Sequence, residues 1–170
     1  MDYQQALDIA KKYLELFKPY CRRIEIAGSI RREKADVGDI ELVAIPDTIE
    51  IPKDLFTTKF MRHEQFIRLV NSLEKVRGDA LGKYTQRILP EGIMLDLFMA
   101  TEDNWGYILA IRTGSADYSR KVLARRWVEK GYHGMNGNLC KHGVPVPVKE
   151  EADLFKMLDI PYIHPRERNL

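Results

Sequence analysis

The sequence has little that would support a disulfide-stabilised or membrane-spanning protein. Only two cysteines occur among its 170 residues, Cys21 and Cys140, and they lie far apart without a CxxC or Cys/His pattern. We therefore expect neither a disulfide framework nor a structural zinc site. No segment approaches the roughly 20 apolar residues of a membrane helix, and residues 1–16 contain no apolar signal core. We expect no membrane partner and a cytoplasmic protein.

The chain also lacks a strong charge of either sign. Its 27 basic and 25 acidic residues give a net charge of +2, so total charge does not by itself indicate a nucleic-acid partner. A hydrophobic content of 45% is ordinary for a protein that builds its own core. This length allows one domain, or one domain with a small appendage. The function must therefore be sought in local patterns.

Hydrophobic spacing predicts an α+β fold made of two parts. Helical spacing predicts helices at 2–18, 62–74, 104–111, 115–130 and 151–158. Alternation predicts strands at 24–27, 39–45, 75–80, 83–89 and 92–99. Pro46 and Pro52 bracket a predicted loop. We expect a mixed β-sheet with flanking helices over residues 1–111, and a smaller α/β subdomain over residues 112–170.

The most informative feature is a pair of acids in the predicted strand at 39–45. Residues two apart in a strand share a face, so Asp39 and Glu41 project together while Ile40 and Leu42 enter the core. Two neighbouring carboxylates repel each other unless a cation lies between them. Taken alone, this pattern also fits a hydrated edge strand.

A third acid, Asp96, lies in an otherwise apolar run of residues, 92–99. A buried carboxylate without a partner is costly, and a metal shared with Asp39 and Glu41 is the partner that we favour. An arginine or a turn is the alternative. Ligands that are all oxygen favour magnesium or manganese over zinc. Two such ions about 4 Å apart suit an in-line phosphoryl displacement.

Gly28 and Ser29 precede these acids and favour a phosphate site. Glycine allows the backbone to approach a phosphate closely, its amides donate, and Ser29 adds a hydroxyl. Arg31 and Arg32 follow, and one of them is able to fork onto a phosphate oxygen while the other is solvated. Each residue alone also fits an exposed turn, and the set as a whole favours triphosphate chemistry.

These segments resemble the nucleotidyltransferase superfamily, whose signature joins a hydrophobic residue and Gly-[Gly/Ser] to Asp-x-[Asp/Glu] across a short spacer. More narrowly, the chain is similar to the family X DNA polymerases, the group of DNA polymerase beta, in a short form with a palm and a C-terminal subdomain only. The matching segments are Ala27-Gly28-Ser29-Ile30-Arg31-Arg32, Asp39-Ile40-Glu41, Leu95-Asp96-Leu97-Phe98, Arg112-Thr113-Gly114-Ser115 and residues 150–168.

The resemblance implies a monomeric, metal-dependent DNA polymerase. Such an enzyme would bind gapped or primer–template DNA, add nucleotides from dNTPs to the primer 3′-hydroxyl, and release pyrophosphate. By resemblance, two Mg²⁺ ions, or Mn²⁺, would be held by the catalytic acids Asp39, Glu41 and Asp96. The nucleotide would be held by Gly28, Ser29, Arg32, Thr113, Gly114, Tyr118 and Ser119. DNA phosphates would be contacted by Arg120, Lys121, Arg125 and Arg126.

Three departures from the family pattern leave parts of this interpretation open. Glu41 stands where the family usually has aspartate, and Met94 replaces an arginine often found two residues before the third acid. Ile111 and Arg112 replace the aromatic pair that guards against ribonucleotides, so the choice of sugar stays open. A nucleotidyltransferase with an RNA, small-molecule or protein acceptor is an alternative. A non-catalytic nucleic-acid-binding module is another, although three clustered acids beside phosphates count against it.

Overall fold

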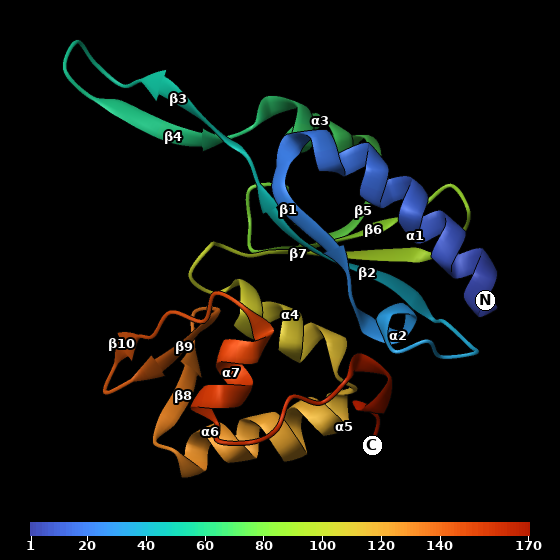
Figure 1. The fold of residues 1–170 in the computed structure, drawn as a ribbon. Helices are drawn as coiled ribbons and strands as arrows, with labels where there is room; N and C mark the ends of the chain where they lie inside the picture. The colour runs from blue at the N-terminus through green and yellow to red at the C-terminus, as the bar shows by residue number, and fades with distance from the viewer.

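The computed structural model describes all residues, 1–170, and its N-terminal part is built on a five-stranded mixed sheet (Figure 1). The strands run in the spatial order β1 (Cys21–Ile26), β2 (Asp39–Pro46), β7 (Met94–Met99), β6 (Tyr84–Ile88) and β5 (Glu74–Gly78). β2 and β7 pair in parallel, and the other neighbours are antiparallel. The predicted α+β class and mixed sheet are confirmed.

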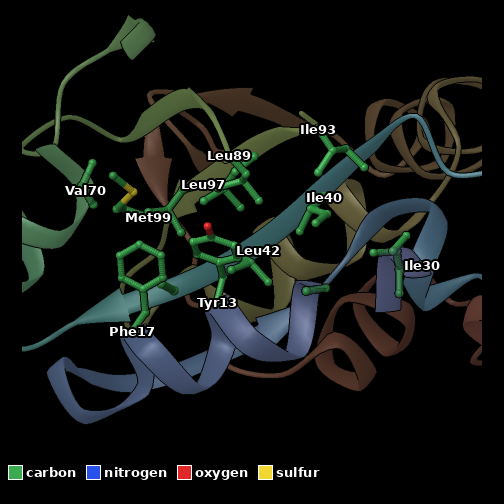
Figure 2. Close-up of a cluster of buried hydrophobic side chains, with 14 of the residues drawn as sticks. Tyr13, Phe17, Ile30, Ile40, Leu42, Val70, Leu89, Ile93, Leu97 and Met99 are labelled. Atoms are coloured by element: carbon green, nitrogen blue, oxygen red, sulfur yellow. The ribbon is translucent and has the colours of Figure 1, made fainter. Parts of the chain in front are cut away.

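Helices α1 (Tyr3–Phe17) and α3 (Glu64–Ser72) cover one face of this sheet. The side chain of Asp2 accepts a hydrogen bond from the Gln5 amide and so fixes the start of α1. The core between the helices and the sheet contains apolar residues from both layers (Figure 2). Its largest members include Phe17, Phe66, Ile40, Leu42, Leu89, Leu95 and Leu97. Each such side chain contributes about 1.5–3 kcal/mol by burial.

Helix α4 (Trp105–Thr113) packs on the opposite face and joins it to the C-terminal lobe. Val43 and Ile45 of β2 and Phe98 of β7 point to this side and enter a second core with Trp105. Successive residues of β2 and β7 therefore belong to different cores, as expected for strands covered on both faces. No helix of the protein has both the length and the apolar character needed to cross a bilayer.

The C-terminal lobe is a helical run followed by a small sheet and a short helix. The helical run predicted at 115–130 is present, with a π-helical middle. It comprises α5 (Ala116–Tyr118), the π-helical η2 (Ser119–Ala124) and α6 (Arg125–Glu129). The other elements are β8 (Tyr132–Met135), β9 (Asn138–Lys141), β10 (Val144–Pro145), α7 (Glu151–Met157) and the 3₁₀ turn η3 (Pro165–Glu167). Two short elements of the N-terminal part are η1 (Lys18–Tyr20) and α2 (Gly28–Arg31).

The prediction of a loop between Pro46 and Pro52 is wrong. Those residues include β3 (Thr48–Pro52), which pairs with β4 (Thr58–Arg62) in a separate two-stranded ribbon that projects from the body (Figure 1). Each proline lies at the last position of a strand, where the ladder tolerates a missing N–H. The prolines therefore mark strand ends and not a loop.

Candidate active site

The parallel pairing of β2 and β7 brings the three predicted acids onto one face of the sheet. Glu41 lies directly opposite Asp96 in the register, and Asp39 shares the face of Glu41 two residues earlier. The alternate residues Ile40 and Leu95 are fully buried on the other side. The face that carries the acids is the one on which α4 and the C-terminal lobe pack.

Burial and neighbouring acids raise the pKa values of Asp39 and Glu41. Burial, followed by the charges of Asp39 and Asp96, raises the pKa of Glu41 to about 7. Burial and Asp96 also raise the pKa of Asp39. Arg32 opposes both shifts and Arg112 opposes that of Glu41. The site therefore concentrates negative charge that a cation would relieve.

Asp96 is held by two polar side chains of the neighbouring strand β6. The Tyr84 hydroxyl and Gln86 Nε2 both donate to Asp96 Oδ1, at 2.7 and 2.8 Å. Burial and the bond to Asp96 raise the pKa of Tyr84, so the phenol is protonated and donates. Arg77 donates in turn to the Tyr84 oxygen at 3.0 Å. One oxygen of Asp96 is thus fixed and the other is left without a protein partner.

Sequence reasoning missed Tyr84 and Gln86. Their i, i+2 spacing places both on one face of β6, and Gln86 lies opposite Asp96 in the register. That register was the missing information, since alternation alone does not say which strand lies beside β7. The arginine partner that we considered for Asp96 is absent.

Gly28 is required by the position of Glu41. Gly28 has φ +60°, and a Cβ placed on it would lie 1.7 Å from Glu41 Oε2. The longer acid therefore occupies the space that any side chain at position 28 would need. A substitution at Gly28 would displace the Glu41 carboxylate.

The acid set fits a hard divalent cation in some respects and not in others. Its donors are all carboxylate oxygens, and the register gives them one face. In this arrangement, however, no three carboxylate, imidazole or thiolate groups are gathered closely enough to hold a metal. The Glu41 carboxylate lies against Gly28.

Ser29 offers a second feature suited to a ligand. Its hydroxyl is buried and makes no hydrogen bond within the protein. A buried hydroxyl without a partner is costly. A phosphate oxygen would supply the missing acceptor; the role of Ser29 in nucleotide binding stays a prediction.

Arg31 and Arg32 both reach the C-terminal lobe, so neither is simply solvated. Arg31 makes a two-pronged pair with Glu151, at 2.9 and 2.6 Å, and also donates to the Thr113 hydroxyl. Burial alone would raise the pKa of Glu151, but Arg31 and the fully buried Arg168 lower it. This buried group of charges links the two lobes.

Arg32 contacts the C-terminal lobe and also lies beside the acid face, by which we mean the face of β2 and β7 that carries the three acids. Its Nη1 donates to the Thr113 carbonyl at 2.7 Å and its Nε donates to Asn169. It also lines a cavity of about 200 Å³ together with Glu41, Arg112 and Gly114. Burial lowers the pKa of Arg32, and the acids partly offset this. The side chain thus lies beside the acids, and its contact with a triphosphate stays a prediction.

The other predicted nucleotide contacts lie together at the end of α4. Gly114 caps that helix, and a Cβ there would meet the Tyr118 ring at 2.6 Å and Ser119 Oγ at 2.7 Å. Tyr118 is buried with its hydroxyl unpartnered, whereas Ser119 Oγ donates to the Ile111 carbonyl. The structure therefore brings Thr113, Gly114, Tyr118 and Ser119 into one group.

The four basic residues predicted to contact DNA are all paired within their own helical run. Arg120 and Lys121 pair with Asp117, and Arg125 and Arg126 pair with Glu129. Pairs of this exposed kind contribute only about 0–1 kcal/mol each. The four basic residues share two carboxylates, so their charge is only partly offset and the run keeps an excess of positive charge.

Comparison with known proteins identifies the class of the fold. Residues 108–169 match the family model of the DNA polymerase beta thumb. The whole chain also matches the crystal structure of Leishmania infantum polymerase beta in a ternary P/T complex, with a TM-score of 0.68 and 18% identity, covering 100% of this chain and 77% of that one. No curated protein matches the sequence.

These matches agree with the resemblance drawn from the sequence. At 18% identity the structural likeness shows the fold, which is that of polymerase beta. The family match adds that residues 108–169 are similar to the thumb of DNA polymerase beta. The chain is therefore polymerase beta-like in its fold and in its C-terminal segment.

Proposed function

We propose that this chain is a metal-dependent DNA polymerase that adds nucleotides from dNTPs to a primer 3′-hydroxyl, in gap-filling synthesis. The observation that carries the proposal is the set of three acids on one face of β2 and β7, with Glu41 beside Asp96. The polymerase beta fold and thumb match support the same reaction class.

In this proposal Asp39, Glu41 and Asp96 would hold two magnesium ions, which manganese could replace. When bound, such ions neutralise the charge that develops on the transferring phosphoryl group. Burial and then the charges of Asp39 and Asp96 raise the pKa of Glu41, and relief of that charge repulsion would favour metal binding.

Asp96 is the acid best suited to accept the proton of the primer 3′-hydroxyl. Tyr84 and Gln86 fix one of its oxygens, which leaves the second available at a defined position. The primer oxygen would form a bond to the α-phosphorus while the bond from that phosphorus to the bridging oxygen breaks. Pyrophosphate leaves with the bridging oxygen, and the primer proton passes by way of Asp96 to solvent.

Ser29 and Arg32 would hold the triphosphate, one through its free hydroxyl and the other through its guanidinium. The group around Gly114, Tyr118 and Ser119 would lie against the base and sugar. Catalysis would then depend chiefly on positioning and charge neutralisation.

DNA is the proposed acceptor because the solved relative is a P/T complex and the thumb segment is of the polymerase type. Arg120, Lys121, Arg125 and Arg126 would exchange their weak helical pairs for DNA phosphates. Those pairs contribute little free energy, so breaking them to bind DNA phosphates would cost little free energy.

The test is incorporation of labelled nucleotides on a one-nucleotide gapped duplex, on single strands and without nucleic acid, with magnesium and with manganese and with both sugars. We expect incorporation only on the duplex, following the templating base. Incorporation that ignores the template, or that needs no nucleic acid, would instead indicate a nucleotidyltransferase with another acceptor.

A further inference from the structure

The β3–β4 ribbon exposes the most accessible large apolar side chains of the protein. Leu55 and Phe56 at its tip are each 94% exposed, and Phe60 on β4 is 68% exposed. The ribbon stands away from the body (Figure 1), so no other part of the chain covers this tip. Apolar surface of this kind, kept in solvent, typically marks an interaction site.

The turn that carries Leu55 and Phe56 is a built structure. The Asp54 carboxylate accepts hydrogen bonds from the Phe56 and Thr57 amides and from the Thr57 hydroxyl, at 2.9, 2.8 and 2.6 Å. These bonds lower the pKa of Asp54, so it stays ionised and engaged inside the turn. Lys53 and Lys59 beside it have no acidic partner among the ion pairs of the structure.

Two hollows connect the base of this ribbon to the acid face. The outer one, about 370 Å³, is lined by Lys59, Phe60, Arg62 and Leu81 among others. The inner one, about 390 Å³, shares Arg62 and extends past Lys83 to Tyr84, Phe98 and Arg112. Tyr84 is the residue that binds Asp96. The ribbon is therefore continuous with the candidate active site.

The charged residues that line these two hollows are all basic. They are Lys59, Arg62, Lys83 and Arg112. None pairs with an acid: Arg62 and Lys83 donate to backbone carbonyls, and Arg112 lies over the Phe98 ring. The four basic residues of the helical run at 116–129, by contrast, share the carboxylates of Asp117 and Glu129. The path to the ribbon is thus lined by positive charge without an acidic partner.

We infer that the β3–β4 ribbon is a DNA-binding arm that holds the primer–template beyond the candidate active site. The inference rests on the proposed function, because that function places the primer–template DNA at the candidate active site. Phosphates would lie along Lys59, Arg62 and Lys83, and Leu55 and Phe56 would insert between bases or stack on them. A path whose charged lining side chains are all basic favours a nucleic acid over a protein partner.

The dimensions of the arm agree with this role. Strands of five residues span about 17 Å at about 3.3 Å per residue, which equals about five base pairs of duplex at 3.4 Å each. The arm would therefore act on DNA that extends at least this far from the primer terminus.

The test compares DNA binding by the full chain and by a Leu55→Ser, Phe56→Ser double variant, using fluorescence anisotropy on a labelled gapped duplex, an intact duplex and a single strand. We expect at least a tenfold rise in Kd on one or more of these, because base stacking and insertion are lost. Both substituted residues are exposed, so the melting temperature should not change. Leu16→Gln, at an exposed residue of α1, is the matched control and should bind normally.

The outcomes separate this inference from the proposed polymerase activity, since anisotropy needs no catalysis. Tip-dependent binding without nucleotide addition would support the arm and reject the polymerase. Equal affinities of the wild type and the tip variant on all three DNAs would overturn the arm, even if the wild type polymerises. Failure of the wild type to bind any DNA would also overturn it.

Discussion

The two faces of the five-stranded sheet differ in composition although they are made from the same two strands. On one face Ile40, Leu42, Leu95 and Leu97 are fully buried under α1 and α3. On the other, the intervening residues include the three acids. The first face stabilises the fold, and the second carries the charged groups of the candidate active site. A substitution on the first face should therefore lower stability and spare activity, whereas a substitution at an adjacent position on the second face should lower activity and spare stability.

The largest effect is expected from Asp96→Asn on the acid face. Loss of the carboxylate that we propose accepts the primer proton and helps to hold a metal should reduce nucleotide addition by about a hundredfold to a thousandfold, by analogy with other removals of single transition-state-stabilising groups. The shape is kept, so the free energy of unfolding should change little. Primer extension and thermal unfolding measure the two effects, and normal turnover would remove Asp96 from the mechanism.

The neighbouring substitution Leu97→Ala tests the opposite face. It removes a fully buried side chain from the core under α1 and should destabilise the protein by about 2–5 kcal/mol. Below its melting temperature, the folded fraction should add nucleotides at close to the normal rate. Denaturant unfolding gives the first quantity. Loss of activity in folded protein would contradict the division between the faces.

The pH dependence of stability tests the electrostatic role of Glu41 on the acid face. Its pKa is raised to about 7 in the folded protein, above its ordinary value of 4.5. For a raised carboxyl pKa, the stabilising contribution is complete below about pH 4.5 and is lost as the pH rises toward 7. The melting temperature without divalent ions should fall across this range because of Glu41.

Glu41→Gln should reduce the fall in melting temperature between pH 4.5 and pH 7. Asp39→Asn removes one of the charges acting on Glu41 and should shift that fall to lower pH. Magnesium at pH 8 should raise the melting temperature of the wild type, since a ligand that binds only the folded state stabilises it. An equal magnesium effect in Glu41→Gln would show that the ion binds elsewhere.

The smallest effect is expected from Tyr84→Phe, which deletes one hydrogen bond to Asp96 and leaves the ring stacked on Phe98. Gln86 still holds the same oxygen, so nucleotide addition should fall by about tenfold, which corresponds to about 1.4 kcal/mol, near the lower end for a bond to a charged group. KM for the nucleotide should stay unchanged if Tyr84 acts through Asp96. A change in KM alone would indicate a direct nucleotide contact.

The acid face could be predicted from the sequence because its signals are local. Alternation in β2 separates Asp39 and Glu41 from Ile40 and Leu42, and the apolar surroundings of Asp96 mark it as a buried charge in need of partners. That need for a partner joined the two acid segments through a shared metal, and the family resemblance then narrowed the hypothesis to a polymerase site.

The features that were missed depend on pairing between distant or neighbouring segments. Gln86 joins Asp96 only through the register of β6 with β7, and Arg31 meets Glu151 across 120 positions of sequence. The β3–β4 ribbon was mistaken for a loop because Pro46 and Pro52 were taken to bound it, although both end strands. Helical spacing could have predicted that Arg125 pairs with Glu129, a standard i, i+4 contact.

Pyrophosphate release on a one-nucleotide gapped duplex tests the central claim most directly. With magnesium and each dNTP in turn, the wild type should release pyrophosphate when the nucleotide matches the template base, and Asp96→Asn should release almost none while keeping its melting temperature. Equal release by the two proteins, or no release by folded wild type with any nucleotide, would contradict the assignment of the acid face as a polymerase site.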